Sequence, residues 1–200
     1  MARAQPSTEG VSPSSPDPRS LTAEVCLTFA MGKYEARIPT DRLYARNHMW
    51  AQRREAGPCS HSPNPESQIP NPSPTPDPRP LTPAFRFGFS AYAVRLLQDV
   101  YFLDWHLSAP AVLVEKQEIG EIESSKAESA LYAPMPGTLT QINADLLADP
   151  STINVDNYGR GWLFEMEGDG AGLLSPDEYL VHLEAAWKLA ERTIKGQMNE

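Results

Sequence analysis

Short stretches in which apolar and polar residues alternate recur along the chain, and this period of two is typical of β-strands. Apolar side chains occupy every second position from residue 25 to 31 and again from 34 to 38, with Gly32-Lys33 between the runs. This arrangement predicts a β-hairpin that turns at Gly32. Further strands are predicted at residues 85–89, 100–105, 138–142 and 161–166, and the strand at 100–105 is expected to be buried.

Two short helices are predicted between the strands. Ser90 is a typical N-cap residue and precedes a helical pattern that extends to Gln98. Asn143 is expected to cap a helix at residues 144–148, which ends before Pro150 because proline cannot continue a helix.

The longest helix is predicted near the C-terminus. Ser175-Pro176-Asp177-Glu178 forms a capping box with proline at the first helical position. One apolar stripe follows it, made of Leu180, Leu183, Trp187, Ala190 and Ile194. A stripe of this kind favours packing on the protein's own sheet over a partner-binding face.

Prolines divide the chain into folded and unfolded parts. Ten of the twenty prolines fall between Pro58 and Pro83, and four more precede Leu21. Such stretches bury too little apolar surface to offset the entropy of ordering. We therefore predict a disordered leader at 1–22 and a single domain at 23–200. Within that domain we expect an added hairpin at 23–39 and a disordered insertion at 55–83, which is interpreted as a spacer rather than as a proline-rich ligand.

Charge and cysteine content narrow the function. A net charge of −9 argues against a nucleic-acid surface, so protein or small-molecule partners are expected. Cys26 and Cys59 have no framework spacing and are interpreted as free thiols, and Cys59 with His61 supplies only two metal ligands. The sequence shows neither a membrane span nor a typical targeting segment, which predicts a cytoplasmic protein without a membrane partner.

A second hairpin is predicted around Lys126. Ile119 and Ile122 lie in one arm, Leu131 and Tyr132 lie in the other, and small polar residues at 123–125 suit a turn between them. Lys126 is therefore expected to project into solvent, where a modifying enzyme can reach it. From these residues alone, an ordinary solvated turn lysine is the favoured interpretation, because exposed lysines are common.

The residues around this hairpin follow a longer motif. They comprise Glu123-Ser124-Ser125-Lys126-Ala127, Leu131-Tyr132-Ala133-Pro134 and Gly137, followed by Asn143, Leu146, Pro150, Asn154 and Tyr158-Gly159-Arg160-Gly161-Trp162. This sequence resembles the H protein of the glycine cleavage system. The resemblance implies a mainly β lipoyl/biotinyl-carrier-like barrel-sandwich hybrid with short helices and a C-terminal helix. Because Ser125 and Ala127 flank the lysine instead of two methionines, lipoate is favoured over biotin.

The resemblance also implies a non-catalytic carrier of glycine catabolism. Lipoate would be attached covalently to Lys126, with Glu123 and Gly137 recognised by the lipoate-attaching enzyme. Glu123 and Gly137 also have simpler interpretations, as a solvated strand-end carboxylate and as a turn residue. The other implied partners are glycine decarboxylase, aminomethyltransferase and dihydrolipoamide dehydrogenase, between which the lipoyl-lysine shuttles the aminomethyl intermediate.

Some positions depart from the family pattern. Val94 and Leu96 are apolar where polar residues are usual, and Gln98 and Lys116 stand where glycine is usual. Two alternatives therefore stay open. One is an H-like lipoyl carrier of another pathway, which relays lipoate or carries a sulfur intermediate. The other is an unmodified H-like binding module.

The histidines suggest no catalytic centre. His48, His61, His106 and His182 are scattered along the chain, and no phosphate loop or zinc signature is present. The resemblance also implies one opening strand at 44–50, in which His48 and Trp50 are expected as structural residues.

Overall fold

The computed structural model describes residues 25–54 and 82–197, and the side chains of residues 189–197 lie outside this description. The strands are β1 Cys26–Met31, β2 Tyr34–Pro39, β3 Leu43–Tyr44, β4 Met49–Arg54, β5 Ala84–Phe89, β6 Val100–Trp105, β7 Ala111–Leu113, β8 Glu118–Ser124, β9 Glu128–Tyr132, β10 Gly137–Ile142 and β11 Trp162–Glu167. The helices are α1 Ala91–Leu97, α2 Asp145–Ala148, α3 Thr152–Val155 and α4 Pro176–Gln197. The predicted leader at 1–22 lies outside the described residues.

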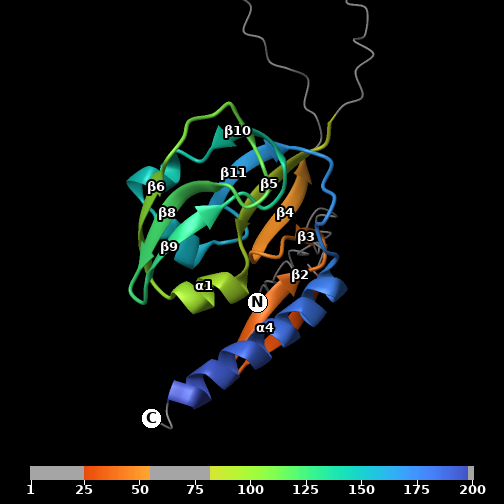
Figure 1. Cartoon of the computed structure of the whole chain (residues 1–200), viewed down its shortest axis with the longest axis vertical. Coiled ribbons are helices and arrows are strands. Elements are labelled where there is room, and N and C mark those ends of the chain that lie inside the picture. Colours follow the sequence, from red (N-terminus) through yellow and green to blue (C-terminus); the bar gives the residue numbers. More distant parts are fainter. Residues whose placement is uncertain (1–24, 55–81, 198–200) are drawn as a thin grey trace, which may run out of the picture.

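Two antiparallel sheets enclose the main core (Figure 1). One contains six strands in the order β3-β4-β5-β11-β10-β7, and the other contains β6-β8-β9. Ile122 from the small sheet and Leu139 and Phe164 from the large sheet are buried in one shared cluster. The alternation of apolar residues places these side chains on the inner faces. The predicted mainly β barrel-sandwich fold, with short helices and a C-terminal helix, is confirmed.

The proline-rich segment connects two strands that are direct neighbours. β4 and β5 pair in antiparallel register from Met49 opposite Phe89 to Arg54 opposite Ala84. Residues 55–83 therefore connect the two paired ends of one hairpin, Arg54 and Ala84. A long connection at this position leaves the pairing of β4 with β5 intact. Residues 55–81 lie outside the described part, so the predicted disorder of this insertion stays a prediction.

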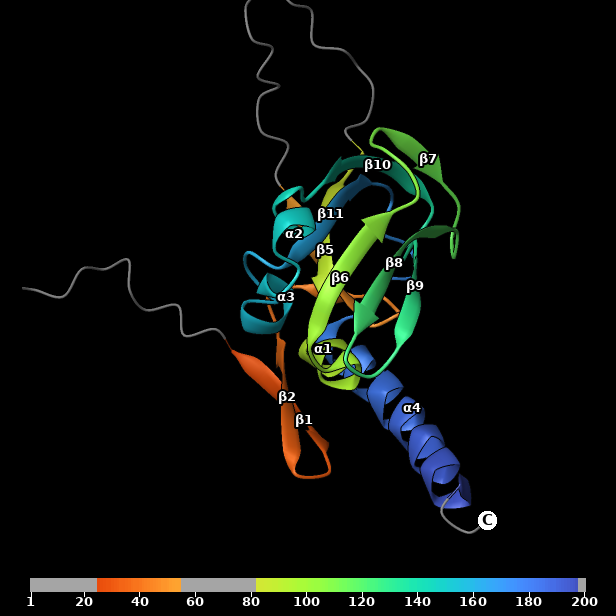
Figure 2. The same cartoon turned by 90° about the vertical axis from the view of Figure 1, so that its left-hand side faces the viewer.

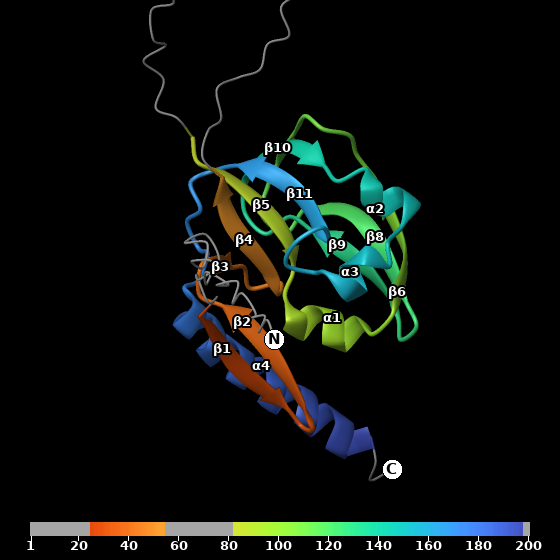
Figure 3. The same cartoon turned by 180° about the vertical axis from the view of Figure 1, so that it is seen from behind.

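The N-terminal hairpin forms a separate two-stranded sheet. β1 and β2 pair from Cys26 opposite Pro39 to Met31 opposite Tyr34, and Gly32 between them has a φ of 65°, so the predicted turn is confirmed. Figure 3 shows this hairpin outside the barrel and beside α4. It buries its inner side chains in a second core cluster, which consists of Phe29, Met31, Ala36, Ile38, Tyr44, Trp50, Tyr92, Tyr179 and Leu183. We call this second cluster the aromatic layer.

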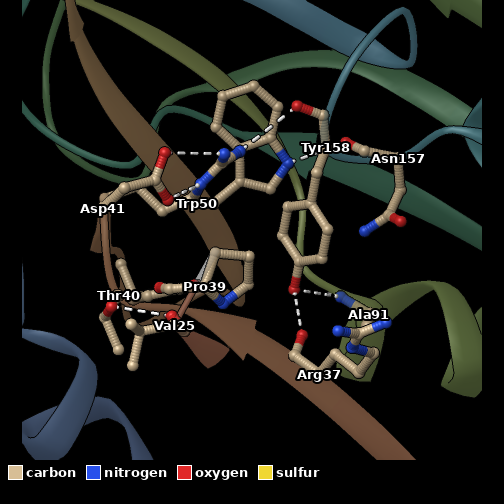
Figure 4. Close-up of polar contacts among 11 residues, drawn as sticks. Val25, Arg37, Pro39, Thr40, Asp41, Trp50, Ala91, Asn157 and Tyr158 are labelled. Carbon is tan, nitrogen blue, oxygen red and sulfur yellow. Dashed lines mark hydrogen bonds and ion pairs between the residues drawn. The ribbon is translucent and has the colours of Figure 1, made fainter. Parts of the chain in front are cut away.

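Tyr158 connects the hairpin to the barrel, and the buried Arg42 packs against its ring (Figure 4). The Arg42 guanidinium lies 5.0 Å from the ring centroids of both Trp50 and Tyr158, and Arg42 donates a hydrogen bond of 3.2 Å to the Tyr158 carbonyl. The Tyr158 hydroxyl donates to the Arg37 carbonyl at 2.6 Å and accepts from the Ala91 amide at 2.9 Å. Tyr158 therefore holds β2, α1 and its own loop in one place.

The C-terminal helix begins as predicted. The Ser175 amide donates to the Glu178 carboxylate at 2.8 Å, and the Glu178 amide donates to Ser175 Oγ at 3.3 Å, which is the reciprocal pattern of a capping box. Leu183 is buried in the aromatic layer, and Leu180 and Trp187 pack against it. Tyr179 is also fully buried, although the sequence pattern did not place it in the stripe.

The prediction of one strand at residues 44–50 is wrong. The chain reverses after β3: the Ala45 amide donates to the Met49 carbonyl at 2.7 Å, and the His48 amide donates to the Ala45 carbonyl at 3.0 Å. His48 has a φ of 66°, a conformation that is uncommon for a residue other than glycine. The segment contains neither glycine nor proline, and Asn47 alone is too weak a signal to predict this turn.

The predictions for 100–105 and for Asn143 also need correction. β6 is only half buried, because Val100 and Leu103 face the core whereas Tyr101 is 58% exposed. The N-cap position of α2 is Ala144. The buried Asn143 amide instead donates 3.1 and 2.7 Å hydrogen bonds to the carbonyls of the 160–162 loop, and its oxygen accepts from the Asp145 amide at 3.3 Å. The two bonds to the Arg160 and Trp162 carbonyls join distant parts of the chain and cannot be inferred from a local pattern.

Candidate carrier site

Lys126 lies at the tip of the β8–β9 hairpin, beside α1 (Figure 2). The strands continue closer to the tip than the sequence predicted, because Glu123 pairs with Glu128 and Ser124 is still part of β8. Ser124 closes the turn: its amide and its hydroxyl donate to the Ala127 carbonyl at 3.0 and 2.9 Å. The turn is therefore held by bonds that do not involve the lysine side chain.

The tip is also fastened to the rest of the protein. The Ser125 amide donates to the Asp99 carbonyl at 3.0 Å, and the Asp99 amide donates to Ser125 Oγ at 3.3 Å. Both neighbours of Lys126 along the hairpin are thus anchored, whereas Lys126 itself is exposed. A group attached to its amine has a fixed origin and a free stem of four methylenes.

Glu123 precedes Ser124, the last residue of β8, and belongs to an acidic outer face of the small sheet. It stands opposite Glu128 across the hairpin, and Glu121 stands opposite Asp104 on the neighbouring strand. Partial desolvation, followed by the charge of Glu123 and a hydrogen bond to it, raises the pKa of Tyr101. Like charges placed directly opposite one another destabilise a sheet. A function outside the fold is one reason to retain such pairs.

Gly137 does not share a surface with Lys126. It is the first residue of β10 in the large sheet, and β10 lies on the far side of the barrel from the β8–β9 tip (Figure 1). A Cβ atom on Gly137 would lie 2.2 Å from the Glu167 carbonyl oxygen, and its φ is 158°. Close packing of β10 on β11 is therefore sufficient to require glycine at this position.

A groove of about 340 Å³ runs beside Lys126. The residues that line it come from the β3–β4 turn, β5, α1 and the β8–β9 hairpin: Asn47, His48, Phe89, Ala93, Leu96, Leu97, Ile122, Lys126, Ala127, Ser129, Ala130 and Leu131. No residue of this described lining carries a carboxylate. The sequence identified Leu96 as an unusual apolar residue, but it gave no indication that Leu96 and Leu97 face the lysine hairpin. The groove suits an uncharged, mainly apolar group.

His48 forms the polar end of this groove and connects it to the aromatic layer. Its Nδ1 lies 3.2 Å from the Tyr179 hydroxyl, which lies 2.9 Å from Ser90 Oγ. Burial, with a smaller contribution from the charge of His182, lowers the pKa of His48 to about 4. His48 is therefore neutral near pH 7. Its buried contacts agree with the structural role expected from the sequence, and its side chain also lines the groove.

The other residues singled out in the sequence provide no metal site in the described part of the chain. Within residues 25–54 and 82–197, no group of three or more His, Cys, Asp or Glu residues is placed to hold a metal ion. Cys26 is a free, partly buried cysteine, whereas Cys59 and His61 lie outside the described residues. None of the described helices is long and apolar enough to span a membrane.

The two facing sheets define a fold of the lipoyl/biotinyl-carrier-like barrel-sandwich class. The model of the family "Glycine cleavage H-protein" matches residues 83–192. The chain therefore belongs to the glycine cleavage H-protein family. This confirms the resemblance recognised in the sequence.

Individual relatives agree with this assignment. A glycine cleavage system H protein of Mycolicibacterium gilvum is 33% identical over 136 residues, which are 68% of this chain and 83% of the relative. A probable H protein of Natronomonas pharaonis is 33% identical over 148 residues, which are 71% and 93%. The crystal structure of a glycine cleavage system H protein from Mycobacterium marinum matches with a TM-score of 0.51 and 31% identity, over 71% of this chain and 95% of that chain. Family membership supports a role as a lipoyl carrier of the glycine cleavage system.

Proposed function

We propose that the protein is a non-catalytic cytoplasmic carrier that bears lipoate on Lys126 and shuttles the aminomethyl intermediate between the enzymes of glycine cleavage. The observation that carries this proposal is the anchored hairpin tip: Ser124 and Ser125 are hydrogen-bonded while Lys126 is exposed. When bound, lipoate would supply a dithiolane that accepts and releases a one-carbon aminomethyl unit.

The residues around Lys126 fit this cofactor. Amide formation removes the positive charge of the lysine amine, so the stem and its acyl chain can lie against apolar side chains without desolvating an ion. Leu96, Leu97 and Ala130 offer such a surface in the groove beside the tip. Glu123 and its acidic neighbours lie on the outer face of the same hairpin, which supports recognition by a lipoate-attaching enzyme and by partners with basic surfaces. The structure gives Gly137 no direct contact with this region, so its recognition role rests on the resemblance alone.

The partners expected for this carrier are glycine decarboxylase, aminomethyltransferase and dihydrolipoamide dehydrogenase. The protein's contribution is to hold the reacting group on a tether, which replaces a bimolecular search by a high effective concentration at each partner's site. The rigid tip supplies a fixed origin for that tether.

Intact mass spectrometry of protein from its native host tests the modification. We expect the mass increment of a lipoyl amide on the peptide that contains Lys126, and its loss in Lys126→Ala. Lys33 offers a matched control because it also lies beside a hairpin turn, next to Gly32. Lys33→Ala should leave the modification intact. An unmodified Lys126 in a host that lipoylates its other proteins would contradict the proposal and favour the unmodified binding module.

A second experiment tests the pathway. Lipoylated protein is combined with the host's own glycine decarboxylase, and exchange of labelled bicarbonate into the glycine carboxyl group is followed. We expect exchange with the lipoylated protein and none with Lys126→Ala. Lipoylated protein that supports no exchange would contradict the role in glycine cleavage.

One observation favours the alternative lipoyl carrier. An aminomethyl group is protonated near pH 7, yet the groove lining contains no carboxylate to neutralise it. A carrier that relays lipoate itself handles an uncharged chain, which the apolar groove accommodates better. Transfer of the lipoyl group from Lys126 to an apo acceptor domain of the same host, measured by mass, would establish this role, and its absence together with active exchange would exclude it.

A further inference from the structure

A second concave site lies near Tyr132, the last residue of β9, next to the lysine groove. It has a volume of about 340 Å³, within the roughly 300–1,000 Å³ that is usual for small-molecule sites. Its walls come from the β3–β4 turn, the β7–β8 turn, the chain from Tyr132 to Pro136 and the loop before α4. Asn47 lines both sites and donates a 3.0 Å hydrogen bond to the Tyr132 carbonyl, so it separates them. We call this site the Arg46 pocket.

Two cations from different turns face the Arg46 pocket. Arg46 comes from the β3–β4 turn and Lys116 from the β7–β8 turn, and both are exposed. The ion pairs among residues 25–54 and 82–197 include neither of them. Glu115 also lines the pocket. The pKa of Glu178 is lowered mainly by its hydrogen bonds to Ser175 and to a smaller extent by the charge of Arg46. The lining itself therefore has a net charge of about one positive unit on a strongly acidic protein.

The backbone at Lys116 is unfavourable for its residue type. Lys116 has a φ of 61°, and its amide donates to the Ala133 carbonyl at 3.0 Å. Glycine adopts this conformation without steric cost, whereas a residue with a Cβ atom is strained in it. A lysine retained in such a position is a reason to look for a use of its charge.

The floor of the Arg46 pocket is apolar. Ala133 and Met135 are buried beneath it, and Pro134, Pro136 and Tyr132 form its sides. The pocket thus combines a basic rim with an apolar floor.

We propose that the Arg46 pocket binds a small monocarboxylate with a short apolar chain. The carboxylate would lie between Arg46 and Lys116, where charge-assisted hydrogen bonds are strongest, and the chain would cover Met135 and the prolines. Glu115 on the same rim disfavours a doubly charged phosphate, because a second negative charge on the ligand would be repelled. This site is independent of lipoate on Lys126.

Nuclear magnetic resonance of the isotope-labelled full-length protein tests the proposal, with hexanoate as the probe. We expect saturable shifts of the Lys116, Ala133 and Ala171 amides with a dissociation constant on the order of millimolar. Hexanol has the same chain without the charge and should bind at least fivefold more weakly. Hexanol that binds equally well, shifts that map to the Lys126 groove, or no saturable shift would each overturn the proposal.

Variants separate the charge from the fold. Lys116→Gln and Arg46→Gln should each weaken hexanoate binding at least fivefold while the rest of the spectrum stays that of the folded protein. Lys33→Gln removes the same charge at the distant N-terminal hairpin and should leave binding unchanged. Lys116→Arg retains the charge and should bind within twofold of the parent protein. Equal weakening by Lys33→Gln would show a general charge effect and overturn the site, as would full binding by Lys116→Gln.

Discussion

The barrel core and the aromatic layer differ in what their buried side chains do for one another. In the barrel, Leu139, Leu163 and Phe164 are fully buried and interact through close packing alone. In the aromatic layer, buried hydroxyls also form hydrogen bonds: Tyr44 donates to the Pro39 carbonyl at 2.7 Å, and the Tyr179 hydroxyl lies 2.9 Å from Ser90 Oγ. The stability of the barrel should therefore depend on the volume of its buried side chains. The stability of the aromatic layer should depend on its hydrogen bonds and on pH.

The lysine groove draws on both regions. Ile122 and Leu131 of its lining belong to the barrel core, whereas His48 contacts the aromatic layer through Tyr179. The hairpin that carries Lys126 is thus built on the packed region, while the polar end of the groove depends on the hydrogen-bonded region. Perturbing each region separately shows which one controls the site.

The largest effect is expected from Gly137→Ala in the barrel. Because its Cβ atom would lie 2.2 Å from the Glu167 carbonyl oxygen, β10 and β11 must separate, and we expect a loss of about 4 kcal/mol in the free energy of unfolding. Gly32→Ala is the matched control, since Gly32 has a φ of 65° but no atom within 4 Å of the added Cβ. It should lose only about 1 kcal/mol. Urea unfolding measures both. A Gly137→Ala protein of normal stability that is not lipoylated would instead establish a recognition role for Gly137.

The next largest effect is a pH dependence that originates in the aromatic layer. The pKa of His48 is about 4 when folded, against 6.5 in the reference state, so the unfolded chain takes up the proton first as the pH falls. Stability is complete above pH 6.5 and is lost between pH 6.5 and 4, by about 3 kcal/mol. His48→Gln should flatten unfolding free energy against pH in this window. An equally steep curve in His48→Gln would assign the loss to carboxylates.

A smaller effect is expected when one hydrogen-bonding group is removed from the aromatic layer. Tyr179→Phe keeps the ring that stacks on Tyr44 at 4.4 Å, but it leaves His48 Nδ1 and Ser90 Oγ without their shared partner. We expect a loss of about 1.5 kcal/mol. The His48 pKa, followed by nuclear magnetic resonance, should also change. Phe87→Leu in the barrel removes no hydrogen bond and provides the comparison. A Tyr179→Phe protein with unchanged stability and unchanged His48 pKa would show that the hydroxyl network does not control the groove.

The sequence predicted the elements of both regions but not their contacts. Alternation and turn residues identified the hairpin at Gly32, the strand at 85–89, the Ser90 cap and the capping box at Ser175, because these signals are local. The family motif identified Lys126 and its hairpin.

The lysine groove was not predicted because its walls come from three separate stretches of the chain, 47–48, 89–97 and 122–131. The turn at His48 has no glycine or proline to indicate it, and the roles of Asn143 and Tyr158 depend on hydrogen bonds to distant carbonyls. The Arg46 pocket likewise depends on two turns that the fold brings together. Lys116 was visible in the sequence only as an unusual replacement for glycine.

The smallest effect on stability is expected at the modified position itself. Lys126→Ala should change the free energy of unfolding by no more than about 0.5 kcal/mol, because the side chain is exposed and the turn is closed by Ser124 and Ala127. Ser124→Ala is the matched comparison: it removes the hydroxyl that bonds to the Ala127 carbonyl at 2.9 Å and should lose about 1 kcal/mol. Urea midpoints measured on unmodified protein compare the two variants without a contribution from lipoate. A loss in Lys126→Ala as large as in Ser124→Ala would mean that the lysine stem packs into the groove, and the tip would then be part of the packed region instead of a free attachment point on it.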